Sequence, residues 1–309
     1  MQKSRMVIHP VKGGKNMSVR KKMLLIINPV AGKMRAQNAD IPGFFAAYDC
    51  TVYTTQNSVL TEEFVESHAP AYDLVVCAGG DGTLNHVING LMRLETRPPL
   101  GYIPCGTTND FATSLGIPRD IRQAASVIQN QNIIPIDIGS FGDRFFSYVA
   151  SFGAFTESSY KAPQENKNKL GHMAYIFEAV RDLPNLRPCR AKVETESGTF
   201  SGEYIFGSVS NSTSLGGMVR LSPDSVSYND GLFEVMLISM PKTPLEFQQI
   251  FFSLLRRQYN TGCVSFFKAN QITFSLETPL PWSLDGEFAQ GTRQIEIKNN
   301  QGAVSLLLP

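Results

Sequence analysis

The spacing of apolar residues changes near Pro135. Before it, four apolar runs of strand length, at residues 23–28, 51–55, 74–78 and 100–103, are separated by stretches with helical periodicity. Helices are predicted at residues 62–68, directly after Gly82, at 109–115 and at 121–129. Strands that alternate with helices are typical of a parallel sheet covered by helices on both faces. The first part of the chain is therefore predicted to be a three-layer α/β domain.

Beyond Pro135 the apolar segments are short, rich in β-branched and aromatic residues, and separated by turn sequences such as Gly142-Asp143. They lie at residues 133–140, 145–152, 191–195, 204–210, 231–238 and 271–276, with helical stretches at 170–183 and 245–259. This pattern predicts an antiparallel β-sandwich domain. We therefore expect a mobile leader at 1–20, an α/β domain with a parallel sheet at 21–135 and a β-sandwich at 136–309, whose last strand could pack back on the first domain.

The 309-residue chain has a net charge of +1, but residues 1–39 contain nine Lys and Arg and no Asp or Glu. The apolar run at 23–27 is too short for a secretion signal, and no apolar window is long enough to span a membrane. Five widely spaced cysteines without a CxxC pair argue for reduced thiols, and four scattered His argue against a zinc site. We expect a cytoplasmic protein, peripheral to the inner membrane face, whose basic leader could be attracted to anionic headgroups.

The most informative segment follows the apolar run at 74–78. It reads Gly79-Gly80-Asp81-Gly82-Thr83 and leads into a helical pattern with one apolar face, formed by Leu84, Val87, Ile88 and Leu91. Glycines here allow unusual backbone conformations and a close approach to the main chain, while the N–H groups of a helix start favour an anion. The segment predicts a phosphate site, with a plain tight turn as the alternative.

A second segment, at residues 103–112, repeats this order of strand, glycine, hydroxyl residues and helix start. Thr107, Thr108 and Asn109 could bond phosphate oxygens or could only cap the helix that begins near Asp110. Other common motifs are absent. The stretch at 28–33 fails as a Walker A loop because Ile27 and Met34 stand where Gly and Ser or Thr are required, and neither GxGxxG nor GxSxG occurs.

Two late turns carry acidic residues. Asp285-Gly286-Glu287 offers a carboxylate that could act as a base, with a hairpin turn and a solvated Glu as the alternative. Asp230-Gly231 opens another apolar run and could also be only a turn.

These motifs, taken in order, resemble those of the bacterial diacylglycerol kinase-like lipid kinases, relatives of sphingosine and ceramide kinases. The resemblance rests on GGDGTLN at 79–85, Gly-Thr-x-Asn-Asp-Phe-Ala at 106–112 and Leu-Asp-Gly-Glu at 284–287. It runs from about Met23 to the C-terminus and includes Asn28-Pro29 with Gly32 and the stretches at 169–175, 215–217 and 229–232. NAD kinases share GGDGT and a two-domain plan, but the stretch at 106–112 points to the lipid branch.

The resemblance implies ATP and Mg²⁺ as cofactors, with ATP bound between the two domains. The implied nucleotide-binding residues are Asn28, Thr55, Gly79, Gly80, Asp81, Gly82, Thr83, Leu84, Asn85, Thr107 and Thr108, where Thr54 could replace Thr55 and one of the last two threonines could suffice. The implied catalytic residues are Asp81, Asp285 and Glu287, the last two being alternative candidates for the base. A structural Mg²⁺ is implied at Ser227, Asp230 and Leu232.

The function implied is that of an ATP-dependent lipid kinase, with diacylglycerol converted to phosphatidic acid. Another lipid alcohol, such as a sphingoid base or phosphatidylglycerol, remains open as the acceptor, because the motifs do not encode the lipid pocket. An NAD kinase-like enzyme and a non-catalytic nucleotide- or lipid-binding protein are the alternatives. The expected partners are ATP and a membrane lipid, with no nucleic acid, and the oligomeric state is open, a homodimer included.

Overall fold

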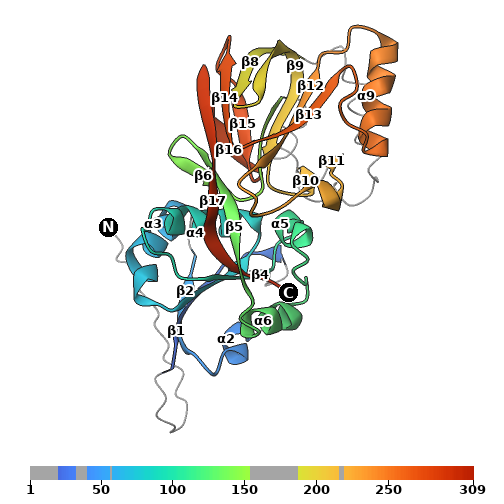
Figure 1. The fold of residues 1–309 in the computed structure, drawn as a ribbon. Helices are drawn as coiled ribbons and strands as arrows, with labels where there is room; N and C mark the ends of the chain where they lie inside the picture. Colours follow the sequence, from blue (N-terminus) through green and yellow to red (C-terminus); the bar gives the residue numbers. More distant parts are fainter. Residues whose placement is uncertain (1–19, 33–39, 56–57, 154–186, 216–218) are drawn as a thin grey trace. The chain divides into compact units, whose positions relative to one another are not determined.

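The computed structural model describes residues 20–32, 40–55, 58–153, 187–215 and 219–309 (Figure 1). Several sequence expectations lie outside these residues. They are the basic leader up to residue 19, the helix at 170–183, the motif at 169–175 and the glycines at 216 and 217. Among the described residues, no helix is long and apolar enough to cross a membrane.

The chain forms two compact units. The first runs to Ile136 and takes in Gly302–Pro309, and the second is Asp137–Gln301. The division falls inside two strands, β5 (Ile133–Phe141) and β17 (Gln294–Leu307).

The first unit is built on a parallel sheet with the strand order β17-β4-β3-β1-β2. Its remaining strands are β1 (Lys22–Ile27), β2 (Asp49–Thr54), β3 (Leu74–Gly79) and β4 (Leu100–Pro104). Every residue of β3 and β4 is buried, as expected for strands that are covered on both faces. The predicted α/β domain with a parallel sheet is therefore confirmed.

Helices cover both faces of this sheet (Figure 1). On one face lie α3 (Ser58–His68) and α4 (Asp81–Met92), and on the other lie α2 (Ile41–Phe44) and α6 (Ile121–Gln129). Two short elements complete the unit, η1 (Ala69–Ala71) and α5 (Asp110–Ser114). The predicted helix at 62–68 begins earlier, at Ser58. Its first turn was missed because the apolar residues there, Val59 and Leu60, are exposed and do not continue the buried face.

Helix α4 is buried almost all round. The predicted apolar face is confirmed, since all four of its residues are fully buried: Leu84, Val87, Ile88 and Leu91. Asn85 and Asn89, which lie off this face, are buried as well. The Asn89 side-chain amide donates to the backbone and side-chain oxygens of Asn85, at 2.9 and 3.1 Å. These bonds compensate for the loss of water around two polar side chains.

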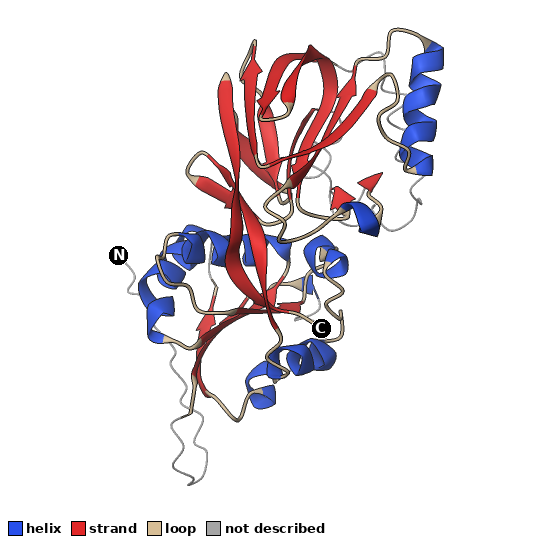
Figure 2. Ribbon diagram, in the orientation of Figure 1, coloured by secondary structure: helices blue, strands red, loops and turns tan. Residues whose placement is uncertain are grey.

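The second unit is an antiparallel β-sandwich, as predicted (Figure 2). Its elements are β6 (Arg144–Phe146), β7 (Val149–Gly153), β8 (Cys189–Thr195), β9 (Gly198–Ser210), β10 (Ser214–Leu215), β11 (Val219–Arg220), η4 (Pro223–Ser225), β12 (Phe233–Ser239), α9 (Pro244–Arg256), β13 (Val264–Ala269), β14 (Gln271–Leu276), β15 (Pro281–Leu284) and β16 (Glu287–Gln290). The long strand β9 pairs with β8 along its first half and with β7 and β12 along its second. Strand β9 therefore connects β8 with β7 and β12.

Trp282 lies at the centre of the core of this unit. Its ring is fully buried, and the ring centroids of Phe141, Phe152 and Phe274 lie 5.2, 4.8 and 5.1 Å from it. Tilted and edge-on aromatic contacts of this kind add to the free energy gained by burying the rings.

Two strand predictions in this unit were wrong in extent. The segment at 145–152 forms two strands, β6 and β7, because the backbone between them turns toward Asp285 instead of continuing a ladder. The segment at 204–210 is only the second half of β9, whose first half is largely exposed and lacks an apolar pattern. Strand β13 was not predicted, and β15 and β16 were expected only as the strands on either side of the Asp285-Gly286-Glu287 turn, without bounds.

The five cysteines are all free thiols. Burial raises the pKa of Cys50 to about 11, with a smaller contribution from the charge of Asp49. Burial also raises the pKa of Cys77 and of Cys189, so these thiols stay protonated at neutral pH. Free thiols agree with the reduced cysteines expected from their spacing.

Candidate active site

The predicted phosphate loops lie where the strand order of the parallel sheet reverses. Strand β1 is in the middle, the chain next forms β2 on one side of it, and β3 then lies on the other side. The carboxyl ends of β1 and β3 therefore form a topological switch point, which is where such sheets bind ligands. Asn28, directly after β1, donates from its side-chain amide to the Thr83 hydroxyl of α4 at 2.8 Å. This bond joins the loop after β1 to the start of α4, directly after the Gly79–Gly82 loop.

Gly80 is the N-cap residue of α4 and has no side chain, so it cannot accept from the N–H groups of the first turn as a capping side chain would. The expected reason for the glycines was wrong in one respect. The glycines do not adopt unusual backbone conformations. Gly80 has an extended backbone with φ −90°, and none of Gly79, Gly82 and Gly106 has a left-handed φ. Close approach is the reason instead: a Cβ on Gly106 would lie 2.6 Å from the Cα of Gly80.

Two hydrogen bonds join the two glycine loops, one between backbone groups and one to a side-chain carboxylate. The Cys105 N–H donates to the Gly79 carbonyl at 2.8 Å, and the Asp110 N–H donates to Asp81 Oδ2 at 2.9 Å. The loops after β3 and β4 thus form one continuous surface of backbone at the end of the sheet. Neither loop could move alone without breaking one of these bonds.

Asn109 closes the second loop and does not cap α5. Its backbone is left-handed, with φ 49°. Its side-chain oxygen accepts from the Gly106 N–H at 2.9 Å, and its side-chain amide donates to the Gly106 carbonyl at 2.8 Å. Asn109 is therefore engaged within the protein, whereas Thr107 and Thr108 in the same loop are exposed residues.

The other predicted nucleotide-binding residues lie in two kinds of position. Thr55 lies at the end of β2, where its N–H donates to the Ile27 carbonyl at 2.9 Å. Leu84 and Asn85 are instead buried in α4, and the Leu84 N–H donates a hydrogen bond to the Gly80 carbonyl. Leu84 and Asn85 therefore offer a ligand less than the loop residues that precede them.

In the second unit, Asp285 and Gly286 form the tight turn between β15 and β16. Both have positive φ angles, 51° and 89°, as in a type I′ hairpin. Asp285 is 3% exposed, and its carboxylate accepts four hydrogen bonds: from Ser147 N at 2.6 Å, Ser147 Oγ at 2.8 Å, and Tyr148 N and Val149 N at 3.0 Å each. Asp285 thereby fastens the hairpin to the segment between β6 and β7.

The two acids of this turn are in opposite environments. Burial raises the pKa of Asp285 above its ordinary value, while the hydrogen bonds from Ser147, Val149 and Tyr148 lower it. A carboxylate has about four lone-pair positions, and all of those on Asp285 have donors. Glu287 is exposed at the start of β16, across the hairpin from Leu284. Of the two, Glu287 is the acid that a substrate could reach.

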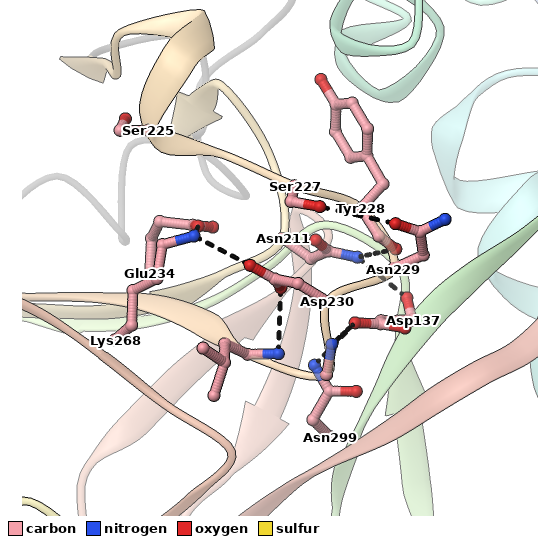
Figure 3. Close-up of polar contacts among 12 residues, drawn as sticks. Asp137, Asn211, Ser225, Ser227, Tyr228, Asn229, Asp230, Glu234, Lys268 and Asn299 are labelled. Carbon is pink, nitrogen blue, oxygen red and sulfur yellow. Dashed lines mark hydrogen bonds and ion pairs between the residues drawn. The ribbon is translucent and has the colours of Figure 1, made fainter.

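The predicted metal turn of the second unit is held by side chains that sequence reasoning missed (Figure 3). Asp230 accepts from the Leu232 N–H at 3.1 Å and from Lys268 Nζ at 3.0 Å. Lys268 also lies 3.1 Å from Glu234 Oε1. Lys268 pairs with Glu234 across β12 and β13, so only the register of these strands could have revealed the contact.

A second acid, Asp137, fixes the same turn. Its carboxylate accepts from the Gly231 N–H at 2.7 Å and from the Asn299 amide at 3.2 Å, and its own N–H donates to the Tyr228 carbonyl at 2.7 Å (Figure 3). The Asn211 amide donates to the same Tyr228 carbonyl at 3.3 Å. The turn is therefore held in place by hydrogen bonds from several parts of the chain.

Glu234 is almost fully buried beside this turn. Burial raises the pKa of its carboxyl group to about 7, although the Lys268 ammonium group opposes the shift. Among the described residues there is no group of three or more His, Cys, Asp and Glu arranged to hold a metal ion. The oxygen of Asp230 suits Mg²⁺ chemically, but Lys268 already pairs with it, so a metal ion would have to displace the ammonium group.

Family models match both units. The model described as "Diacylglycerol kinase catalytic domain" matches residues 22–141, which include the loops after β1, β3 and β4. The model described as "YegS C-terminal NAD kinase beta sandwich-like domain" matches residues 151–307, which include the Asp285–Glu287 turn.

Similar proteins cover most of the chain. A diacylglycerol kinase of Bacillus subtilis (strain 168) is 37% identical over 275 residues, which are 87% of this chain and 90% of that protein. A diacylglycerol kinase of Staphylococcus aureus (strain bovine RF122 / ET3-1) is 32% identical over 278 residues, 87% of each chain. The fold is shared with a solved diacylglycerol kinase structure from Bacillus anthracis str. Sterne, with a TM-score of 0.77 and 24% identity over 94% of this chain and 98% of that chain. With this likeness along nearly its whole length, the chain belongs to the diacylglycerol kinase family of ATP-dependent lipid kinases.

Proposed function

We propose that the chain transfers the γ-phosphoryl group of ATP to the hydroxyl group of diacylglycerol and so forms phosphatidic acid. One observation carries this proposal: the glycine loops after β3 and β4 interlock at the switch point of a parallel sheet, beside a helix start whose N-cap residue is a glycine. Backbone N–H groups in this setting suit phosphate groups. The name that the relatives carry supports diacylglycerol as the acceptor.

We place the nucleotide against the loops of the first unit. Its phosphates would lie along Gly80–Gly82, where the dipole of α4 favours negative charge, and the exposed residues Thr107 and Thr108 are the next side chains that we expect to contact it. When bound, Mg²⁺ neutralises phosphate charge during transfer. Asp81, the acid in the first turn of α4, is the carboxylate that we nominate to hold this ion.

Glu287 is the residue that we nominate as the base. Its carboxylate would take the proton of the lipid hydroxyl as that oxygen bonds to the γ-phosphorus and the bond to the β,γ-bridging oxygen breaks, which releases ADP. Asp285 would act as a positioning residue, because its four hydrogen bonds hold the hairpin that carries Glu287. The exposure of Glu287 and the burial of Asp285 support this division of roles.

Incubation with labelled ATP and Mg²⁺ tests the proposal. We expect the label to appear in phosphatidic acid when diacylglycerol is supplied in mixed micelles, and to remain in ATP when NAD is supplied alone. Labelled NADP would favour an NAD kinase-like enzyme, and label in a sphingoid base or phosphatidylglycerol would change the acceptor. No transfer to any acceptor, with ATP still bound, would leave a non-catalytic binding protein.

The turn at Ser227, Asp230 and Leu232 remains our proposed site for a structural Mg²⁺, with Lys268 as the competing cation. We expect bound Mg²⁺ to stabilise the folded state and so to raise the melting temperature, by about 2–4 °C for each kcal/mol that binding adds to the free energy of unfolding. Asp230→Asn should abolish this rise, and Lys268→Met should enlarge it, since the variant removes the ammonium group from Asp230. Calorimetry with and without Mg²⁺ measures both effects. If Mg²⁺ changes the melting temperature equally in the unaltered protein and in both variants, this turn does not bind Mg²⁺ and Asp230 only pairs with Lys268.

Diacylglycerol is a membrane lipid, so we also propose that the protein works in the cytoplasm, peripheral to the inner membrane face. The absence of a membrane-spanning helix among the described residues fits contact from one side.

A further inference from the structure

Helix α9 of the second unit is apolar on the face that it turns to solvent. Leu245 is 64% exposed, Phe252 46% and Leu255 50%. Their spacing, i, i+7 and i+10, places them on one side of the helix. Ile250, on the opposite side, is buried. A helix with large apolar residues on both sides is expected to have a partner on its outer face as well as on its inner one.

The ends of α9 are fixed by its own sequence, so these side chains are held in a set pattern. Thr243 caps the helix start, accepting from the Glu246 N–H at 3.2 Å, and Glu246 accepts in return from the Lys242 N–H at 2.6 Å. At the other end, Arg257 has a left-handed backbone, with φ 54°, and the Gln258 N–H donates to the Ser253 carbonyl at 3.0 Å. Helix α9 is thus capped at both ends, and it lies at one side of the strands of its unit (Figure 1).

Positive charge accompanies the exposed apolar residues. The guanidinium carbon of Arg256 lies 5.3 Å from the centroid of the Phe252 ring, so this cation and this ring occupy the same part of the surface. Arg257 follows directly, and Lys242 is exposed just before the helix. The acid of the first turn, Glu246, is used in the helix cap. The outer face of α9 is therefore apolar with a cationic border.

We propose that the α9 outer face, formed by Leu245, Phe252, Leu255, Arg256 and Arg257, is the surface by which this protein docks on an anionic lipid bilayer. An apolar strip with basic residues at its edge suits a bilayer surface, where the strip enters the acyl boundary and the arginines meet headgroup phosphates. A symmetric contact with a second copy would instead bring the arginines of both copies into one interface, where they repel. The proposal rests on the proposed function, which requires access to a membrane lipid.

Sedimentation of the full chain with vesicles tests this surface. We expect binding to vesicles of phosphatidylcholine mixed with phosphatidylglycerol and weaker binding to phosphatidylcholine alone. Phe252→Ser combined with Leu255→Ser should lower partitioning on the mixed vesicles by at least about tenfold, because two partly exposed apolar side chains no longer enter the bilayer. Val59→Ser on α3 is the matched control, since Val59 is also an exposed apolar helix residue, at 62%, and should leave partitioning unchanged.

The charged border needs its own variant. Arg256→Gln combined with Arg257→Gln should lower partitioning on the mixed vesicles by roughly tenfold and leave the weaker binding to phosphatidylcholine alone nearly unchanged. Melting temperatures close to that of the unaltered protein would show that all variants fold. Equal sedimentation of the unaltered protein and the Phe252 and Leu255 variant would overturn the proposal, as would a dimer in sedimentation equilibrium that this variant dissociates.

A second assay separates this proposal from the proposed function. Phosphorylation of a dispersed short-chain diacylglycerol should be the same in the Phe252 and Leu255 variant and the unaltered protein, while phosphorylation of diacylglycerol within vesicles should fall with partitioning. If neither form of diacylglycerol is phosphorylated, the proposed function fails, and the sedimentation result still decides whether α9 docks on the bilayer.

Discussion

Glu287→Gln is expected to lower turnover on diacylglycerol by at least about 10²-fold, the size typical of a lost general base, with the affinity for ATP nearly unchanged. Glutamine keeps the shape of the side chain but cannot take the hydroxyl proton. Glu287 is exposed at the start of β16, so the change should not disturb the core. Single-turnover phosphorylation and an ATP titration on the same preparation measure the two quantities.

Two further variants give this result its meaning. Glu277→Gln, an exposed acid outside the site, should leave turnover unchanged. Asp285→Asn should lower the melting temperature as well as turnover, because an amide group cannot accept all four hydrogen bonds from Ser147, Tyr148 and Val149. Near-normal turnover in Glu287→Gln would remove this residue from the mechanism.

Gly80→Ala is expected to weaken ATP binding by at least about tenfold, and Gly82→Ala should do so too, since small displacements in a positioning loop have large effects. A Cβ on Gly80 would lie 3.2 Å from the Cα of Gly106, so the two loops would have to separate. That movement would strain the bonds from Cys105 to Gly79 and from Asp110 to Asp81. Isothermal titration with ATP measures the loss.

Gly262→Ala is the matched control for these glycine variants. A Cβ at this position would meet no atom closer than Gln249 Oε1, at 4.0 Å, so ATP affinity should be unchanged. Unaltered ATP affinity in folded Gly80→Ala and Gly82→Ala proteins would mean that the loop after β3 is a turn without a role in nucleotide binding.

Features written in short stretches of sequence could be predicted. The apolar face of α4 has helical spacing, and α6 begins and ends at the predicted residues, Ile121 and Gln129. The parallel sheet followed from the alternation of apolar runs and helical segments, and its central strands β3 and β4 are buried on both faces, as unbroken apolar runs predict. These features depend on residues close together in the chain, which a local pattern can encode.

Features that depend on distant residues could not be predicted. The choice between Asp285 and Glu287 stayed open because the donors to Asp285 come from 136 to 138 residues earlier. The contact between Lys268 and Asp230 depends on the register of β12 and β13, and β13 gave no clear alternating pattern. The close approach of Gly80 and Gly106 likewise depends on neighbouring strands. In each case the contact forms between segments that are far apart in the sequence and are brought together only by the fold.

The return of the C-terminal segment to the first unit bears on how the protein is synthesised. Strand β17 pairs with β4 through Leu306 and Leu100, so the edge of the parallel sheet lacks its final strand until residues 302–309 have left the ribosome. During translation of the second unit, β4 therefore presents unpaired backbone groups, a template on which nascent chains associate. A truncation before Gly302 would make this temporary exposure permanent, although it removes no residue from the nucleotide loops.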